Sequence, residues 1–213
     1  MSGMDSVKTN RTRRQRGYSF EHELVRRINS CNGWKAIRLG SPSVAMPDVV
    51  AVNNAKGIML AIEAKSTSTD TIKVPIEQVA RCINWLNLFT RYRHRHAILA
   101  LKFMSKRWKK AYTYEHRALQ EYYYRWEWDE EAHHDDVVSK VMRILLEESK
   151  KSSKSYIACK YDGSLCIYIN DAGTDAATIL TNTNSSNYEG RRIRLDLNAF
   201  TMPWESKNKD DSG

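Results

Sequence analysis

The sequence predicts an α/β protein, with a core over residues 17–110 and a C-terminal α+β extension over residues 111–213. Apolar residues recur at helical spacing in two segments of the core, and short apolar runs between turn signals indicate several strands. Near residue 110 the charge balance and the aromatic content both change. Helices and strands that alternate along a chain are typical of a sheet with helices packed on it.

The composition is that of a globular protein of ordinary size. The 213 residues suit one domain, or a small domain with an appendage, and 41% hydrophobic residues are enough for a core. No apolar run approaches the roughly 20 residues of a spanning helix, which excludes an integral membrane protein. The N-terminus lacks the apolar stretch of a secretory signal, and the cysteines form no CxxC pair. We therefore expect an intracellular protein, cytoplasmic or nucleoid-associated, and not a secreted one.

The net charge of +9 is divided unevenly along the chain. Residues 1–110 contain 21 Lys and Arg against 7 Asp and Glu, a balance of +14. Residues 111–213 contain 13 against 18, a balance of −5. A basic half of this kind is typical of a region that binds a polyanion. Residues 1–16 are basic and lack apolar periodicity, so we expect a flexible basic arm there.

The core opens with a helix over residues 19–30, which begins at a capping serine. Its inward stripe consists of Phe20, Leu24 and Ile28. A short strand (34–39) and a loop with two prolines (40–47) follow the helix.

The rest of the core alternates between strands and a second helix. Two strands (48–52 and 58–65) are separated by a short turn and predict a hairpin, and residues 66–74 are a polar connection. A long helix (75–89) begins at a proline, which suits the first position of a helix. An apolar run (96–103) is typical of a buried strand.

The C-terminal extension is predicted to be helical at first and then to contain a β-hairpin. Residues 112–128 are rich in aromatic side chains, and residues 137–146 read as a short amphipathic helix. Strands at 155–161 and 164–170 flank Asp162-Gly163, one of the strongest hairpin signals. Further strands are expected near residues 177–180 and 190–197.

The sharpest chemical pattern is Asp48 at the start of one strand and Glu63 and Lys65 on the next. Because strand side chains alternate, Glu63 and Lys65 point to one face with Met59 and Ala61, while the intervening apolar residues form the expected core face. Pairing in the hairpin brings Asp48 close to Glu63. Two carboxylates beside an ammonium group form an oxygen-rich site suited to Mg²⁺, and without a cation the two carboxylates repel each other.

Each of these residues has a role in phosphodiester hydrolysis. Asp48 and Glu63 would hold Mg²⁺, with Mn²⁺ as a substitute, and the metal would polarise the phosphoryl oxygen and lower the pKa of a bound water. Lys65 would position that water or stabilise the developing negative charge. The alternative is structural: Asp48 caps a turn, and Glu63 and Lys65 are strand residues on the solvent side.

Glu21 is a third candidate carboxylate. It lies three residues before Leu24 and seven before Ile28, so it borders the apolar stripe of the first helix. The structural alternative is a favourable interaction of Glu21 with the helix dipole. Because Glu21 leans toward the core, we expect it to face the site.

Five segments are similar to one known family: GYSFEHELV (17–25), AIRLGS (36–41), PDVVA (47–51), LAIEAKS (60–66) and ALKF (100–103). Together they resemble the archaeal Holliday junction resolvases, which belong to the PD-(D/E)xK nuclease superfamily. The resemblance covers roughly residues 15–110 in the family's order. It implies a restriction-endonuclease-like core, in which helices flank a central mixed sheet.

The resemblance also implies a metal-dependent site. Its catalytic residues fall on Glu21, Asp48, Glu63 and Lys65, and the three carboxylates are the implied metal ligands. Arg38 and a loop serine, Ser41 or Ser43, match residues that contact DNA phosphate near the scissile bond. The family often has Arg directly after the helix glutamate, whereas this chain has His22, which weakens that phosphate contact or makes it pH-dependent.

Further basic residues suit phosphate contacts. Arg13 and Arg14 in the basic arm are expected to bind DNA. The runs at 91–96 and 106–110 interleave basic and aromatic residues, for which a solvated basic face is the structural alternative.

The second helix carries more apolar surface than one core needs. One stripe consists of Val79, Cys82, Ile83, Leu86 and Phe89. Trp85, Leu88 and Tyr92 form a second sector, which requires cover from the C-terminal region or from a partner subunit. Because members of the similar family are symmetric dimers, we expect a homodimer through this sector.

The function that these patterns favour is a structure-specific DNA endonuclease. It would resolve four-way (Holliday) junctions by paired metal-dependent nicks in recombination and repair. One alternative is another PD-(D/E)xK nuclease, acting on duplex, nicked or flapped DNA. A second is a non-catalytic DNA-binding module, with a protein partner docked on the C-terminal region; the intact Asp48, Glu63 and Lys65 argue against it.

Overall fold

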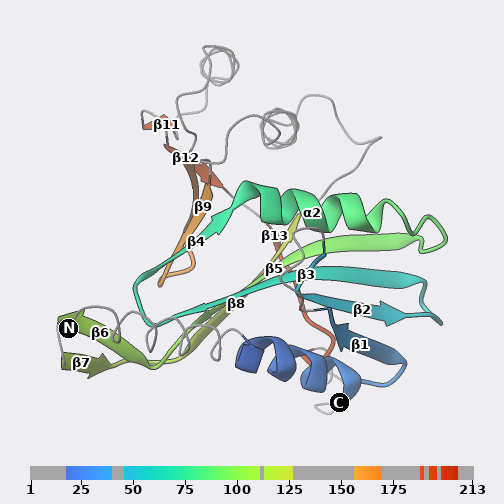
Figure 1. Cartoon of the computed structure of the whole chain (residues 1–213), viewed down its shortest axis with the longest axis horizontal. Helices are drawn as coiled ribbons and strands as arrows, with labels where there is room; N and C mark the ends of the chain where they lie inside the picture. The colour runs from blue at the N-terminus through green and yellow to red at the C-terminus, as the bar shows by residue number, and fades with distance from the viewer. Residues whose placement is uncertain are drawn as a thin grey trace, which may run out of the picture.

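The computed structural model describes residues 18–39, 46–110, 113–126, 156–168, 188–189, 192–195 and 198–205. Its centre is a six-stranded sheet in the order β1-β2-β3-β5-β8-β13 (Figure 1). The strands are β1 (Trp34–Arg38), β2 (Val49–Asn53), β3 (Ile58–Thr67), β5 (His94–Phe103), β8 (Gln120–Trp126) and β13 (Asn198–Ala199). β3 and β5 are parallel and all other neighbours are antiparallel. The predicted α/β fold with a central mixed sheet is confirmed.

A second sheet has five strands in the order β11-β12-β10-β9-β4. The strands are β4 (Thr71–Pro75), β9 (Tyr156–Lys160), β10 (Leu165–Tyr168), β11 (Tyr188–Glu189) and β12 (Arg192–Leu195). The predicted hairpin around Asp162-Gly163 is confirmed as β9–β10. Gly163 has φ +84°, and a Cβ there would lie 2.8 Å from the ring of Tyr122, so both the turn and the close approach require glycine.

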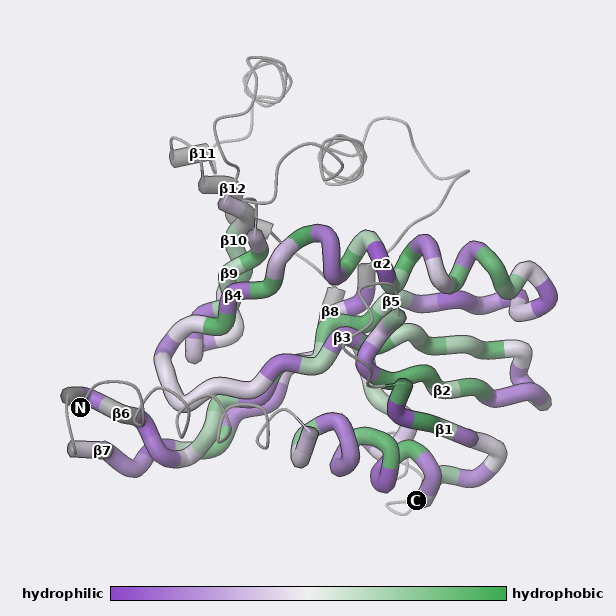
Figure 2. The backbone as a smooth tube through the Cα atoms, viewed as in Figure 1, coloured by the Kyte–Doolittle hydropathy of each residue, from purple (hydrophilic) through white to green (hydrophobic). Residues whose placement is uncertain are grey.

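Two helices cover the two faces of the central sheet. The first spans residues 18–29, and the second, α2, spans Ile76–Leu86. Phe20, Leu24 and Ile28 pack on one face with Ile62 and Ala64, as the stripe of the first helix predicts. On the other face, α2 packs through a predicted stripe that includes Val79, Cys82, Ile83 and Leu86. Figure 2 shows apolar residues along the strands that lie between the helices.

The face of β3 that carries Glu63 is a second core and does not face solvent. Met59 is 3% exposed and Ala61 is fully buried, because α2 and the second sheet cover them. The sequence predicted a single core face on this strand, formed by Ile62 and its neighbours. Alternation along one strand identifies which residues share a face, but it cannot reveal that a distant helix covers the opposite face. Glu63 therefore lies at the edge of a core.

The elements differ from prediction in four places. The start of the C-terminal extension was predicted to be helical, but its described residues form the strands β7 (Thr113–His116) and β8. β4 covers the second half of the segment predicted to be a polar connection and extends to Pro75, and it pairs with β9, which is more than 80 residues further along the chain. α2 ends three residues early, at Leu86, since Phe89 N–H bonds to Leu86 O in a tighter turn. The run at 106–110 forms a strand, β6. The predicted basic arm (1–16), the helix at 137–146 and the strand near 177–180 lie outside the described residues.

The predicted domain boundary near residue 110 does not coincide with an edge of the central sheet. β8 pairs with β5 along seven residues, and β13 pairs with β8. Met202 is fully buried in the core beneath the first helix. The described residues of the C-terminal extension therefore complete the sheet that begins in the predicted core. No helix among the described residues is long and apolar enough to cross a membrane.

Candidate active site

The β2–β3 ladder brings Asp48 and Glu63 together. Val49 pairs with Ile62, so Asp48, one residue earlier, lies beside Glu63. The Oδ2 atom of Asp48 accepts a hydrogen bond from the backbone N–H of Ala64, at 2.9 Å, which fixes this carboxylate against β3. The hairpin prediction thus places the two carboxylates correctly.

Lys65 bridges the two carboxylates. Its Nζ donates to Glu63 Oε1 and lies 3.5 Å from Asp48 Oδ2. The side chain of Lys65 is 29% exposed, whereas that of Glu63 is 1% exposed. The ammonium group therefore lies on the solvent side of the buried Glu63 carboxylate, between Glu63 and the more exposed Asp48.

Arg81 is a site residue that the sequence analysis missed. It lies on α2, and its Nη2 donates to Glu63 Oε2 at 2.9 Å. Each oxygen of Glu63 thus contacts a different cation. A signal was available in the sequence, because Arg81 lies between Ala80 and Cys82, both buried, and an arginine beside a buried stripe needs a partner. We call Asp48, Glu63, Lys65 and Arg81 the Glu63 cluster.

Burial controls the electrostatics of the Glu63 cluster. Burial raises the pKa of Glu63, and repulsion from Asp48 adds to the rise, while Lys65 and Arg81 oppose it without cancelling it. For Lys65, burial alone would lower the pKa, but attraction to Glu63 and Asp48 outweighs it, and the pKa lies above its ordinary value. The inner carboxylate is therefore under-compensated, and a further positive charge would stabilise its ionised form.

Glu21 lies on the other face of the sheet and pairs with Arg38. Glu21 is buried, and its Oε2 accepts a hydrogen bond from Arg38 Nε. The guanidinium of Arg38 also lies 4.2 Å from the centre of the Tyr18 ring. Because Leu39 N–H bonds to the backbone oxygen of Asp48, Arg38 is close to the start of β2. Glu21 and Arg38 are thus at the same end of the sheet as the Glu63 cluster.

Of the remaining residues predicted to contact DNA, one is exposed in the structure and the others lie outside the described residues. His22 is exposed on the first helix. Ser41, Ser43, Arg13 and Arg14 lie outside the described residues.

Glu21 and the two carboxylates of the Glu63 cluster do not form one metal-binding group. Among the described residues, no three Asp, Glu, His or Cys side chains lie close enough to hold one metal ion. Asp48 and Glu63 fit a divalent cation nonetheless, because both offer carboxylate oxygens to the same ammonium group. Such hard, anionic oxygens are the ligands that Mg²⁺ prefers. Glu21 as a third ligand stays a prediction.

A second group of charges, which we call the Lys102 cluster, consists of Glu23, Arg27, Lys102 and Glu121. It lies on the first-helix face, and Lys102 pairs in register with Glu121. Arg27 Nη1 donates to Glu121 at 2.6 Å, and Lys102 Nζ donates to Glu23 at 2.6 Å. Burial would raise the pKa of Glu121, but hydrogen bonds from Arg27, Tyr123 and Lys102 outweigh it and lower that pKa.

The predicted dimer sector is partly used within the chain. Trp85 packs against the core, with its ring centroid 4.4 Å from that of Phe89. The hydroxyl of Tyr92 donates to Asn54 Oδ1 at 2.8 Å. Leu88 is 74% exposed. The dimer interface stays a prediction, and Leu88 is its most accessible residue.

The comparisons with known proteins agree with the resemblance in the sequence. Residues 12–131 match the family described as archaeal Holliday junction resolvase (hjc), so the match extends past the predicted boundary and includes β8. This match covers more than half of the chain, and the chain belongs to that family.

Two individual relatives are similar over shorter stretches. The crossover junction endodeoxyribonuclease Hje of Sulfolobus acidocaldarius is 35% identical over 97 residues, which are 44% of this chain and 66% of that protein. The structure of Hjc from Archaeoglobus fulgidus, a Holliday junction resolvase, is 27% identical and matches with a TM-score of 0.34, over 41% of this chain and 65% of that one. The chain thus spans just under two thirds of the length of each of these relatives.

Proposed function

We propose that this protein is a divalent-metal-dependent endodeoxyribonuclease that cuts four-way DNA junctions. The main support is the position of Asp48 and Glu63, which both contact the ammonium group of Lys65 at one end of the central sheet. Membership of the resolvase family supports the substrate, since the two relatives are named for junction cleavage. Such an enzyme would serve in recombination and repair, where it would resolve junctions by paired cuts.

The residues of the Glu63 cluster would have different roles, according to how deeply each is buried. Glu63 anchors the site from within the core, where Arg81 donates to its Oε2 atom. Asp48 lies on the more exposed side of the site, where the backbone N–H of Ala64 fixes its carboxylate. Lys65, which is partly exposed, can donate to the attacking water or to a non-bridging phosphoryl oxygen, where it stabilises developing negative charge.

Asp48 and Glu63 would hold the metal, and Glu21 is the proposed third ligand. When bound, a divalent cation supplies Lewis acidity to the phosphoryl oxygen and lowers the pKa of a water molecule. Arg38 lies at the same end of the sheet. A phosphate of the substrate could replace Glu21 as the partner of Arg38, because Arg binds phosphate oxygens in a bidentate manner.

The direct test is incubation of the purified full-length chain with a synthetic four-way junction and with a linear duplex of the same sequence. With Mg²⁺ we expect nicks in the junction and intact duplex, and with EDTA we expect no cleavage. Equal cutting of both substrates would instead indicate a general PD-(D/E)xK nuclease. Binding without cleavage under all metal conditions would indicate a DNA-binding module.

We further propose that the protein acts as a homodimer, because a four-way junction presents two strands for symmetric cutting. Leu88→Glu is the cleanest variant, since this side chain is exposed and its loss leaves the monomer core intact. We expect light scattering to report a dimer for the wild type and a monomer for the variant. A wild-type monomer that makes paired cuts would contradict this proposal.

A further inference from the structure

A basic hairpin projects from the end of the central sheet. β6 (Lys106–Lys110) and β7 (Thr113–His116) form a two-stranded sheet of their own, joined to neither larger sheet. Figure 1 shows this hairpin extending away from α2, beyond the ends of β5 and β8, and Figure 2 colours it largely hydrophilic. β6 has the sequence KRWKK, and its partner strand contains one acidic residue. We call this hairpin the basic arm hairpin.

The root of the basic arm hairpin is fixed to the body of the protein. Arg117 donates from Nη1 to Asp70 at 2.7 Å and from Nε to the backbone oxygen of Met104 at 3.1 Å. Its guanidinium also lies 4.3 Å from the centre of the Tyr161 ring. Arg107 donates to the same aspartate, Asp70. A single carboxylate thus joins the hairpin to the loop between β3 and β4, which gives the hairpin a defined direction.

The two faces of the basic arm hairpin differ in charge balance. The register pairs Arg107 with Glu115 and Lys106 with His116. On the first face, Glu115 neutralises Lys109 at 2.6 Å and lies 3.7 Å from Arg107. On the second face, Lys106 forms no ion pair with any described residue, and its Nζ lies 5.0 Å from the centre of the Tyr114 ring.

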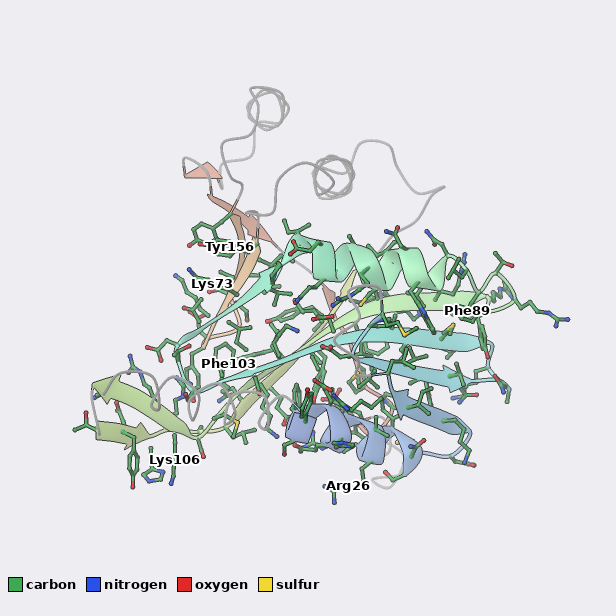
Figure 3. All side chains as sticks on the ribbon, viewed as in Figure 1. Arg26, Lys73, Phe89, Phe103, Lys106 and Tyr156 are labelled. Carbon is green, nitrogen blue, oxygen red and sulfur yellow. The ribbon has the colours of Figure 1, made fainter. Side chains whose placement is uncertain are left out.

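The second face therefore offers cationic and aromatic groups to an outside partner. Tyr114 is 51% exposed, its ring lies 5.4 Å from that of His116, and Figure 3 shows Lys106 on the projecting hairpin. A lysine beside an exposed tyrosine and histidine, with no acidic residue on that face, matches the chemistry of a nucleic-acid backbone.

The hairpin leaves the sheet at the end that carries the site. β3 and β5 are parallel, and Lys65 pairs in register with Leu101, five residues before Lys106. At roughly 3.3 Å per residue, Lys106 lies up to about 17 Å beyond the level of the site, and Lys110 up to about 30 Å. Phosphates of one strand repeat every 3.4 Å or so along the helix axis, so this reach corresponds to roughly five to nine nucleotides.

We infer that the Lys106 face of the basic arm hairpin binds the phosphate backbone of a duplex arm, about half a turn to one turn from the phosphate that is cut. This inference rests on the proposed function for the position of the cut. It assigns the hairpin a positioning role: the hairpin sets the angle of one junction arm, while the Glu63 cluster performs the chemistry.

The test compares three exposed lysines that differ in location and in ion pairing. Lys106→Ala removes the unpaired charge, Lys109→Ala removes a charge from the opposite face of the same hairpin, and Lys56→Ala removes an exposed charge from the turn between β2 and β3. Binding of a fluorescent four-way junction to each full-length variant is measured by anisotropy in EDTA, between 50 and 300 mM NaCl.

We expect Lys106→Ala to weaken junction binding about tenfold and to reduce the slope of log affinity against log salt by about 0.9. Lys109→Ala and Lys56→Ala should stay within about twofold of the wild type. In a junction with uncharged methylphosphonates five to nine nucleotides from the cut, the wild type should bind as weakly as Lys106→Ala.

Three results separate the inference from the proposed function. Equal effects of Lys106→Ala and Lys109→Ala, with normal cleavage by the wild type, would overturn the inference alone. Unchanged binding in Lys106→Ala, with normal cleavage by the wild type, would also overturn it. Absence of junction binding by the wild type would overturn the proposed function itself.

Discussion

The Glu63 cluster and the Lys102 cluster contain the same charges but balance them differently. Each has two carboxylates and two basic side chains, and they occupy opposite faces of one sheet. In the Lys102 cluster, hydrogen bonds overcome burial and the pKa of Glu121 falls. In the Glu63 cluster burial dominates and the pKa of Glu63 rises. The comparison teaches that the balance of desolvation against compensation, and not the number of charges, distinguishes the two clusters, and we propose the Glu63 cluster as the one that accepts a cation.

The largest expected effect is on cleavage. Asp48→Asn and Glu63→Gln should each lower junction cleavage by at least about a thousandfold, because each removes a proposed metal ligand and metal catalysis contributes several kcal/mol. Junction binding should stay within a few-fold, as neither residue is a proposed phosphate contact. Single-turnover cleavage and anisotropy measure the two quantities, and near-normal cleavage by either variant would refute the site.

The same change in the Lys102 cluster should act on stability. Glu121→Gln removes the charged partner that Arg27 and Lys102 share, so we expect the free energy of unfolding to fall by about 3 kcal/mol. Cleavage by the folded variant should remain within a few-fold of normal. Urea denaturation provides the measurement, and Glu115→Gln, which removes an exposed carboxylate, is the matched control and should leave the stability unchanged.

A smaller effect is expected from Arg81, which acts through Glu63. Arg81→Met should lower the affinity of the DNA-free protein for Mn²⁺ by about tenfold, because residues that orient a metal ligand typically contribute 10- to 100-fold. Arg81→Lys should recover part of this affinity. Calorimetric titration tests the prediction, and an increase in affinity would show that Arg81 competes with the metal and does not position its ligand.

The last prediction concerns the pH dependence of stability and His96, on β5. Burial lowers the pKa of His96 to about 4, with Arg125 and His94 adding to the shift, and its ring lies 5.8 Å from that of Phe200. In the unfolded chain histidine titrates near 6.5 or so, so the unfolded state takes up the proton first as the pH falls.

His96 therefore contributes stability above about pH 6.5 and loses it as the pH falls toward 4. The difference in unfolding free energy between the wild type and His96→Gln should be constant above that range and shrink below it. A difference that does not change with pH would contradict the assignment.

Local patterns in the sequence predicted the elements that position the site. The alternation in β2 and β3, with a short turn between them, was sufficient to place Asp48 beside Glu63 and Lys65. The stripe Phe20, Leu24 and Ile28 likewise placed the first helix, because three buried residues at helical spacing have one consistent arrangement.

The features that the sequence did not predict depend on contacts between distant segments. β4 is short, and its partner β9 is distant in the chain, so no local signal separates it from a polar connection. The contact of Arg81 with Glu63 depends on how α2 crosses β3. The contact of Glu21 with Arg38 likewise depends on how the first helix lies against β1, and the approach of Glu21 to the other carboxylates stays a prediction.

Cation-dependent stability in the absence of DNA tests the contrast between the two clusters most directly. The free energy of unfolding of the wild type should rise with Mg²⁺ or Mn²⁺, by about 2.7 kcal/mol at a hundred times the dissociation constant. Glu121→Gln should keep this gain, although it starts from a lower stability, and Asp48→Asn and Glu63→Gln should lose it. A wild type that gains nothing from the cation, or a Glu63→Gln variant that gains as much as the wild type, would contradict the assignment of the Glu63 cluster as the metal site.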